Sequence, residues 1–195
     1  VLMAGTGVNG EEVLYSQLRL ILKAEGAEPA AIEKQIKLQR VLLSTVVDHP
    51  QASKEELGTQ LAEAVDRWFA DEDLKEDELE QTTRSSLDSL TAPWLRTFLT
   101  LEPHDALSKT HCPVLAIGGE KDLQVDPKLN LPAIRRALEE AGNSQFEIVE
   151  MPGLNHLFQA CTTGSVSEYA NLEETFNVAA LEKMTDWILS VTAKR

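Results

Sequence analysis

The stretch from Cys112 to Phe158 contains the residues that decide the fold. It reads CPVLAIGGEKDLQVDP over residues 112–127, LPAIRRALEEAG over 131–142 and FEIVEMPGLNHLF over 146–158. An apolar run and a turn with an acid come first, followed by an amphipathic stretch, a second apolar run and a turn with a histidine. This order predicts a strand, a helix and a second strand, and such a βαβ unit builds a parallel sheet with a right-handed crossover.

Each of these elements has its own local signals. Val114–Ile117 is wholly apolar, as expected of a strand that is buried on both faces. The predicted helix has Pro132 near its start and Gly142 at its end. The apolar residues of the helix recur at helical spacing. The second strand also begins with apolar residues. These residues are Leu131, Ile134, Leu138 and Ala141 in the helix, and Phe146, Ile148 and Val149 in the strand.

A charged residue follows each predicted strand. Asp122 comes after the first strand, and His156 comes after the second. The loops that leave the carboxyl ends of parallel strands carry the chemistry in sheets of this kind. We therefore expect Asp122 and His156 to lie at the same edge of the sheet, within hydrogen-bonding distance of each other.

This pairing resembles the acid and base of the α/β-hydrolase family, in which Ser, then Asp or Glu, then His follow one another along the chain. Residues 113–125 resemble the penultimate strand and acid turn of that family, and MPGLNHLF (151–158) resembles its last strand and histidine loop. VLMAGTGV (1–8) resembles the strand that follows the nucleophile helix. Residues 91–117 and 163–175 are similar to a group of bacterial carboxylesterases with a helical cap, so the resemblance covers the whole chain.

The resemblance implies a serine hydrolase that acts on a small-molecule carboxylic ester without a cofactor or a metal ion. His156 would be the general base and Asp122 the acid that orients it. Asp126, which precedes Pro127, is the alternative acid, unless it simply begins the helix. Two other functions stay open: a serine peptidase of the same fold, and a non-catalytic binding module made of the cap and a three-stranded sheet.

The nucleophile motif of the family, G-x-S-x-G, is absent from this sequence. TGSVS (163–167) and GNSQF (142–146) place a serine near a glycine, but neither has the pattern or a strand before it. We therefore expect the nucleophile to lie upstream of Val1, and this chain alone to be inactive. The strand at residues 1–4 would then lack a neighbour, which predicts self-association through the exposed sheet edge or by exchange of part of the helical insertion.

The predicted fold class is α/β: the C-terminal part of an α/β-hydrolase, with a small parallel sheet and a large all-helical cap insertion. Residues 1–7 and 109–195 would form the partial core, and residues 8–108 the cap. The predicted helices of the insertion are 11–25, 30–47, one opened by a capping box of Ser53 and Glu56, a weaker one at about 76–90, and a short one from Pro93.

A long polar segment, residues 159–176, separates His156 from the last predicted helix. Its polar side chains either anchor it beside the histidine or form a tether without a chemical role. The candidate anchors are Glu168, Tyr169, Glu173, Glu174 and Thr175. Asn177 is expected to cap the last helix, whose apolar stripe is Leu181, Met184, Trp187, Ile188 and Val191.

Composition excludes several classes of function. The 195 residues carry a net charge of −14, which argues against binding nucleic acid or an anionic membrane through a basic surface. No apolar run reaches the roughly 18 residues of a membrane helix. Gly5, Gly7 and Gly10 fit G-x-G-x-x-G, but no βαβ unit follows them, so the match is weak. We expect free thiols at Cys112 and Cys161, and no metal ligands among His49, His104 and His111.

Overall fold

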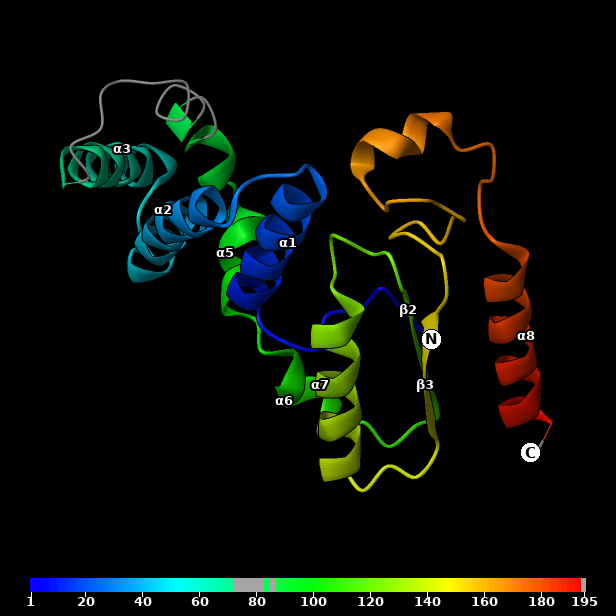
Figure 1. Cartoon of the computed structure of the whole chain (residues 1–195). Coiled ribbons are helices and arrows are strands. Elements are labelled where there is room, and N and C mark those ends of the chain that lie inside the picture. The colour runs from blue at the N-terminus through cyan, green and yellow to red at the C-terminus, as the bar shows by residue number, and fades with distance from the viewer. Residues whose placement is uncertain (72–82, 85–86, 194–195) are drawn as a thin grey trace. The chain divides into compact units, whose positions relative to one another are not determined.

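A computed structural model of the protein describes residues 1–71, 83–84 and 87–193 (Figure 1). It has an α/β fold with a small three-stranded parallel sheet and a mostly helical remainder. The chain forms two compact units. One consists of Val1–Gly26 together with Glu102–Arg195 and contains the sheet, and the other is Ala27–Leu101.

The sheet consists of β1 (Leu2–Met3), β2 (Val114–Gly119) and β3 (Phe146–Met151), in the order β1-β2-β3. Both pairs of neighbouring strands are parallel. The predicted βαβ unit is confirmed, with helix α7 (Pro127–Glu140) connecting β2 to β3 (Figure 1). All six residues of β2 are buried, which explains why this strand reads as an apolar run.

The side chains of β2 pack on both faces of the sheet. Leu115 and Ile117 lie in a cluster with residues of β3 and of helix α8 (Val178–Thr192), and Val114 and Ala116 lie in a second cluster with α7. Burial of one large aliphatic side chain contributes about 2 kcal/mol. Apolar packing on both faces of the sheet therefore stabilises β2, the strand that precedes the Asp122 turn.

Asp126 caps the start of helix α7, because its carboxylate accepts a hydrogen bond from the Lys128 N–H at 2.9 Å. The buried side chain of Asn130 ties this helix to the loop after β1, because its Oδ1 accepts from the Gly7 N–H at 2.8 Å. A Cβ on Gly7 would lie 2.4 Å from the Asn130 carbonyl oxygen. The glycine of the G-x-G-x-x-G match thus allows close packing of the loop on α7.

The sheet unit also contains helices α1 (Gly10–Ala24) and α6 (Pro103–Leu107). Asn9 caps α1 by accepting from the Glu12 N–H at 3.1 Å, and Ser16 of α1 donates to the carboxylate of Asp126 at 2.9 Å. The contact between Ser16 and Asp126 joins α1 to the start of α7, and the expected insertion of residues 8–108 stays a prediction.

The second unit contains α2 (Pro29–Asp48), α3 (Lys54–Asp71) and α5 (Pro93–Thr100). The predicted capping box is confirmed: the Ser53 N–H donates to Glu56 Oε2 at 2.8 Å, and the Glu56 N–H donates to Ser53 Oγ at 3.2 Å. Most of the predicted helix at about 76–90 lies outside the described residues. The buried apolar residues of α2 and α3 include Ile32, Ile36, Leu43, Val46, Leu57, Leu61, Val65, Trp68 and Phe69.

Helix α8 begins at Asn177 as predicted, with Asn177 Oδ1 accepting from the Ala179 N–H at 3.0 Å. Met184 and Trp187 pack against the sheet cluster. Burial of the whole predicted stripe is wrong, because Leu181 and Ile188 are each 47% exposed. Ala180 is the one residue of α8 that is buried, so the helix covers the sheet with only part of its apolar stripe.

The outer edge of β1 pairs with no strand in the described part of the chain, whose sheet order is β1-β2-β3. Val1 is 52% exposed and Met3 is 44% exposed beside this edge. Self-association through the edge stays a prediction. Among the described residues, no helix is long and apolar enough to cross a membrane.

Candidate acid–histidine site

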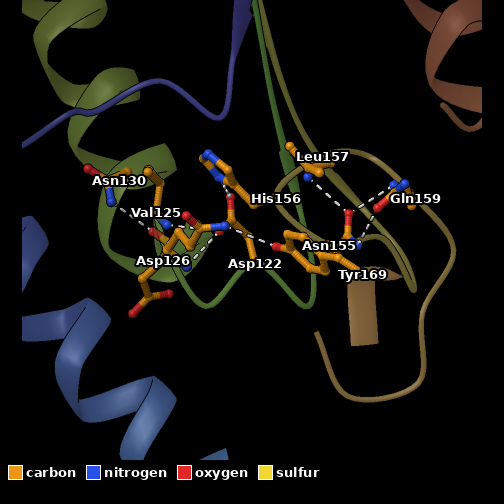
Figure 2. A network of polar contacts seen from close by, with 10 residues as sticks. Asp122, Val125, Asp126, Asn130, Asn155, His156, Leu157, Gln159 and Tyr169 are labelled. Carbon is orange, nitrogen blue, oxygen red and sulfur yellow. Dashed lines mark hydrogen bonds and ion pairs between the residues drawn. The ribbon is translucent and has the colours of Figure 1, made fainter. Parts of the chain in front are cut away.

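Asp122 lies in the turn that follows β2, and its side chain is completely buried. Its Oδ1 accepts hydrogen bonds from the backbone N–H groups of Gln124 and Val125, both at 2.8 Å (Figure 2). Burying a charge without partners is strongly unfavourable, and hydrogen bonds to the ionised form stabilise it. The two backbone N–H groups of the turn thus bind Asp122 Oδ1 and leave Oδ2 free to accept a hydrogen bond from another side chain.

That second oxygen contacts His156. The distance from His156 Nδ1 to Asp122 Oδ2 is 2.8 Å. Both residues follow the carboxyl ends of the neighbouring parallel strands β2 and β3, so they emerge at one edge of the sheet. The geometric prediction from the sequence is confirmed. The His156 side chain is 26% exposed, whereas that of Asp122 is fully covered.

The direction of this hydrogen bond decides what the histidine can do. An ionised carboxylate can only accept, so Nδ1 of a neutral His156 carries the proton and Nε2 keeps its lone pair. The bond to Asp122 is the single hydrogen bond of the His156 ring within the described residues. Nε2 is therefore available to accept a proton from another group.

The loop that presents His156 is held by Asn155, whose role the sequence reasoning missed. Asn155 is fully buried, and its Oδ1 accepts from the N–H groups of Leu157 at 2.9 Å and Gln159 at 3.0 Å (Figure 2). Its Nδ2 donates to Gln159 Oε1 at 3.1 Å. Phe158 in the same turn has a φ of 57°, which disfavours a bulky residue. Such a conformation persists where the surrounding structure imposes it, as these bonds do here.

The acid turn and the histidine loop approach each other through their backbones. The Lys121 N–H donates to the Leu154 carbonyl at 2.9 Å. A Cβ on Gly119 would lie 2.4 Å from the Leu154 carbonyl oxygen and 2.5 Å from that of Asn155. Only glycine at position 119 permits this approach, on which the Asp122–His156 contact depends.

Gly119→Ala is therefore expected to push the two loops apart and weaken the bond between Asp122 and His156. We expect a loss of about 2 kcal/mol in the free energy of unfolding, together with loss of the downfield proton NMR signal of His156 Nδ1–H. Gly58→Ala is the control, because a Cβ there meets nothing within 4 Å. An unchanged Nδ1–H signal in Gly119→Ala would contradict this role of the glycine.

The other acid and histidines have separate partners. Asp126, the alternative acid, caps α7 and accepts from Ser16, while Asp122 is the partner of His156. His104 forms a pair with Glu140 at 2.7 Å, but both side chains are at least half exposed. His49 Nδ1 lies 2.8 Å from the Thr45 carbonyl oxygen. His111 is exposed. The two cysteines, Cys112 and Cys161, are free thiols.

Three of the predicted anchors hold the segment after His156. Glu174 accepts from the Ala160 N–H at 2.6 Å, Glu168 accepts from the backbone at Thr162 and Thr163, and the Tyr169 hydroxyl accepts from Gln124. Glu173 and Thr175 are exposed. The segment is thus fastened to the site and to itself by the polar residues that the sequence singled out.

In the ranges 1–71, 83–84 and 87–193, no group of three or more His, Cys, Asp or Glu side chains is placed to hold a metal ion. Comparison of the chain with known protein families, with curated proteins and with solved structures found no match.

Proposed function

We propose that the protein is a serine hydrolase, specifically a carboxylic-ester hydrolase of the α/β-hydrolase fold, to which this chain contributes the acid and the base. The observation that carries the proposal is the 2.8 Å contact between a fully buried Asp122 and the Nδ1 atom of His156. The pair stands at the carboxyl edge of a parallel sheet, in the chain order acid, then histidine, that the family uses.

In this proposal Nε2 of His156 removes the hydroxyl proton of a serine as its Oγ attacks the ester carbonyl carbon. The same proton then passes from Nε2 to the leaving alcohol, and a water molecule repeats the cycle to release the acid. Asp122 stabilises the imidazolium that forms between these steps. The serine and the oxyanion donors are not among the residues of this chain assigned to the site.

A burial argument favours catalysis over a binding module. Asp122 is taken completely out of water and is satisfied by two backbone N–H groups and one histidine. A structural turn needs only the backbone bonds, which a neutral asparagine side chain also accepts. The carboxylate and the partly exposed imidazole together make a base with an open Nε2, which a purely structural turn does not require.

The test is a panel of chromogenic esters with short and long acyl chains, assayed on the full-length protein and on residues 1–195 alone. The full-length protein is expected to hydrolyse the esters, and the chain alone is expected to show background rates. A peptide amide panel distinguishes the peptidase. Hydrolysis by the isolated chain that survives repurification, or no hydrolysis by the full-length protein, would contradict the proposal.

A further inference from the structure

The segment of residues 161–171, here called the brace, lies against the acid turn. The Lys121 Nζ donates to the carbonyl oxygens of Cys161 and Thr162, both at 2.9 Å. Gly164 has a φ of 79°, and a Cβ there would lie 2.0 Å from the Lys121 carbonyl oxygen. The brace is therefore in backbone contact with the turn that carries Asp122, from a place about forty residues further along the chain.

One carboxylate fixes the shape of the brace. Glu168 accepts from the N–H groups of Thr162 at 2.7 Å, Thr163 at 2.9 Å and Gly164 at 3.1 Å. These bonds lower the pKa of Glu168 to about 2. Because the folded pKa lies below the ordinary value, the stabilisation is present above about pH 4.5 and is lost as the pH falls toward 2. At neutral pH Glu168 is therefore ionised and accepts from these three N–H groups.

The brace carries Tyr169 to the acid–histidine pair. The Tyr169 hydroxyl accepts from Gln124 Nε2 at 3.0 Å, and the backbone N–H of the same Gln124 donates to Asp122. Burial raises the pKa of this hydroxyl, the nearby Asp122 raises it further, and Gln124 and the His156 backbone oppose the rise. The phenol oxygen of Tyr169 thus contacts the acid turn through the side chain of Gln124.

We propose that Tyr169 is a positioning residue for the Asp122–His156 pair, held in place by the brace. Its hydroxyl fixes the side chain of Gln124, and through Gln124 the turn whose backbone N–H groups hold Asp122 Oδ1. The path from Tyr169 to the acid therefore runs through a single side chain, that of Gln124. This role deepens the proposed function and rests on it for its catalytic meaning.

The test compares Tyr169→Phe with Ser167→Ala, which removes a hydroxyl from the same short helix, Val166–Asn171. Proton NMR of residues 1–195 reports the Nδ1–H of His156 and its exchange with water, and this readout does not depend on ester hydrolysis. We expect Tyr169→Phe to speed that exchange roughly tenfold and Ser167→Ala to leave it unchanged. In the full-length protein, Tyr169→Phe is expected to lower kcat roughly tenfold with KM unchanged.

Three further variants keep the outcome decisive. Gln124→Ala and the double variant with Tyr169→Phe are expected to match the single variants, because one bond is removed in all three. Gly164→Val is expected to lift the brace and reproduce the faster exchange. An Nδ1–H that exchanges at the wild-type rate in Tyr169→Phe, or additive effects in the double variant, would overturn the proposal. If exchange changes while no form hydrolyses esters, the positioning role stands and the proposed function fails.

Discussion

Replacing His156 by alanine in the full-length protein is expected to lower kcat for ester hydrolysis by about four orders of magnitude or more. The serine would then lose the group that takes its proton, and removal of one triad member costs nearly as much as removal of all. Steady-state kinetics on the best ester of the panel measures the loss. KM is expected to change far less than kcat, because the proton transfer occurs in the transition state.

His104 supplies a matched control for this experiment. It also pairs with a carboxylate, Glu140, at 2.7 Å, but in an exposed position. His104→Ala is expected to keep the wild-type kcat. Asp122→Asn is expected to cost about 10⁴ in kcat, because an amide nitrogen facing Nδ1 favours the wrong tautomer. Comparable activity in His156→Ala and His104→Ala would contradict the assignment of the base.

The second large effect is expected for Asn155→Ala, and it concerns stability. The substitution leaves two N–H groups of the histidine loop without their acceptor, and one of them, that of Gln159, is buried. An unsatisfied buried donor costs about 1–3 kcal/mol, so we expect a loss of about 3 kcal/mol in the free energy of unfolding. Hydrogen exchange of the β2 and β3 amides against urea measures it within the sheet unit.

Asn9→Ala is the control for this prediction. Asn9 also accepts a backbone N–H, but it does so at an exposed helix start, where loss of the cap costs about 1 kcal/mol. Asn155→Ala is further expected to abolish the downfield Nδ1–H signal of His156, whereas Asn9→Ala keeps it. Equal losses of stability in the two variants would show that the loop is held by something other than Asn155.

The sheet and the acid–histidine pair could be predicted from the sequence because their signals are local. The apolar run of β2, the proline and glycine that bracket α7, and the order of Asp122 and His156 each depend on a few adjacent residues. The parallel topology then follows from the handedness of βαβ units. No longer-range information was needed to bring the two side chains together.

The parts that were missed depend on contacts between distant segments. The roles of Asn155 and Gly119 rest on backbone groups whose positions only the folded chain defines. The contact between Ser16 of α1 and Asp126 joins residues 110 positions apart in the chain. The burial of the apolar stripe of α8 was overestimated. Helical periodicity predicts which residues share an apolar face, but it does not predict how much of that face the rest of the protein covers.

The most direct test of the central claim is the reaction of the full-length protein with a fluorophosphonate. Attack of the serine Oγ on phosphorus expels fluoride, and His156 Nε2 takes the serine proton, so labelling reports the nucleophile and its base together. The account predicts one labelled serine by mass spectrometry, a labelling rate reduced at least a hundredfold in His156→Ala, and the wild-type rate in His104→Ala. The absence of a serine adduct, or equal rates in His156→Ala and the wild type, would contradict it.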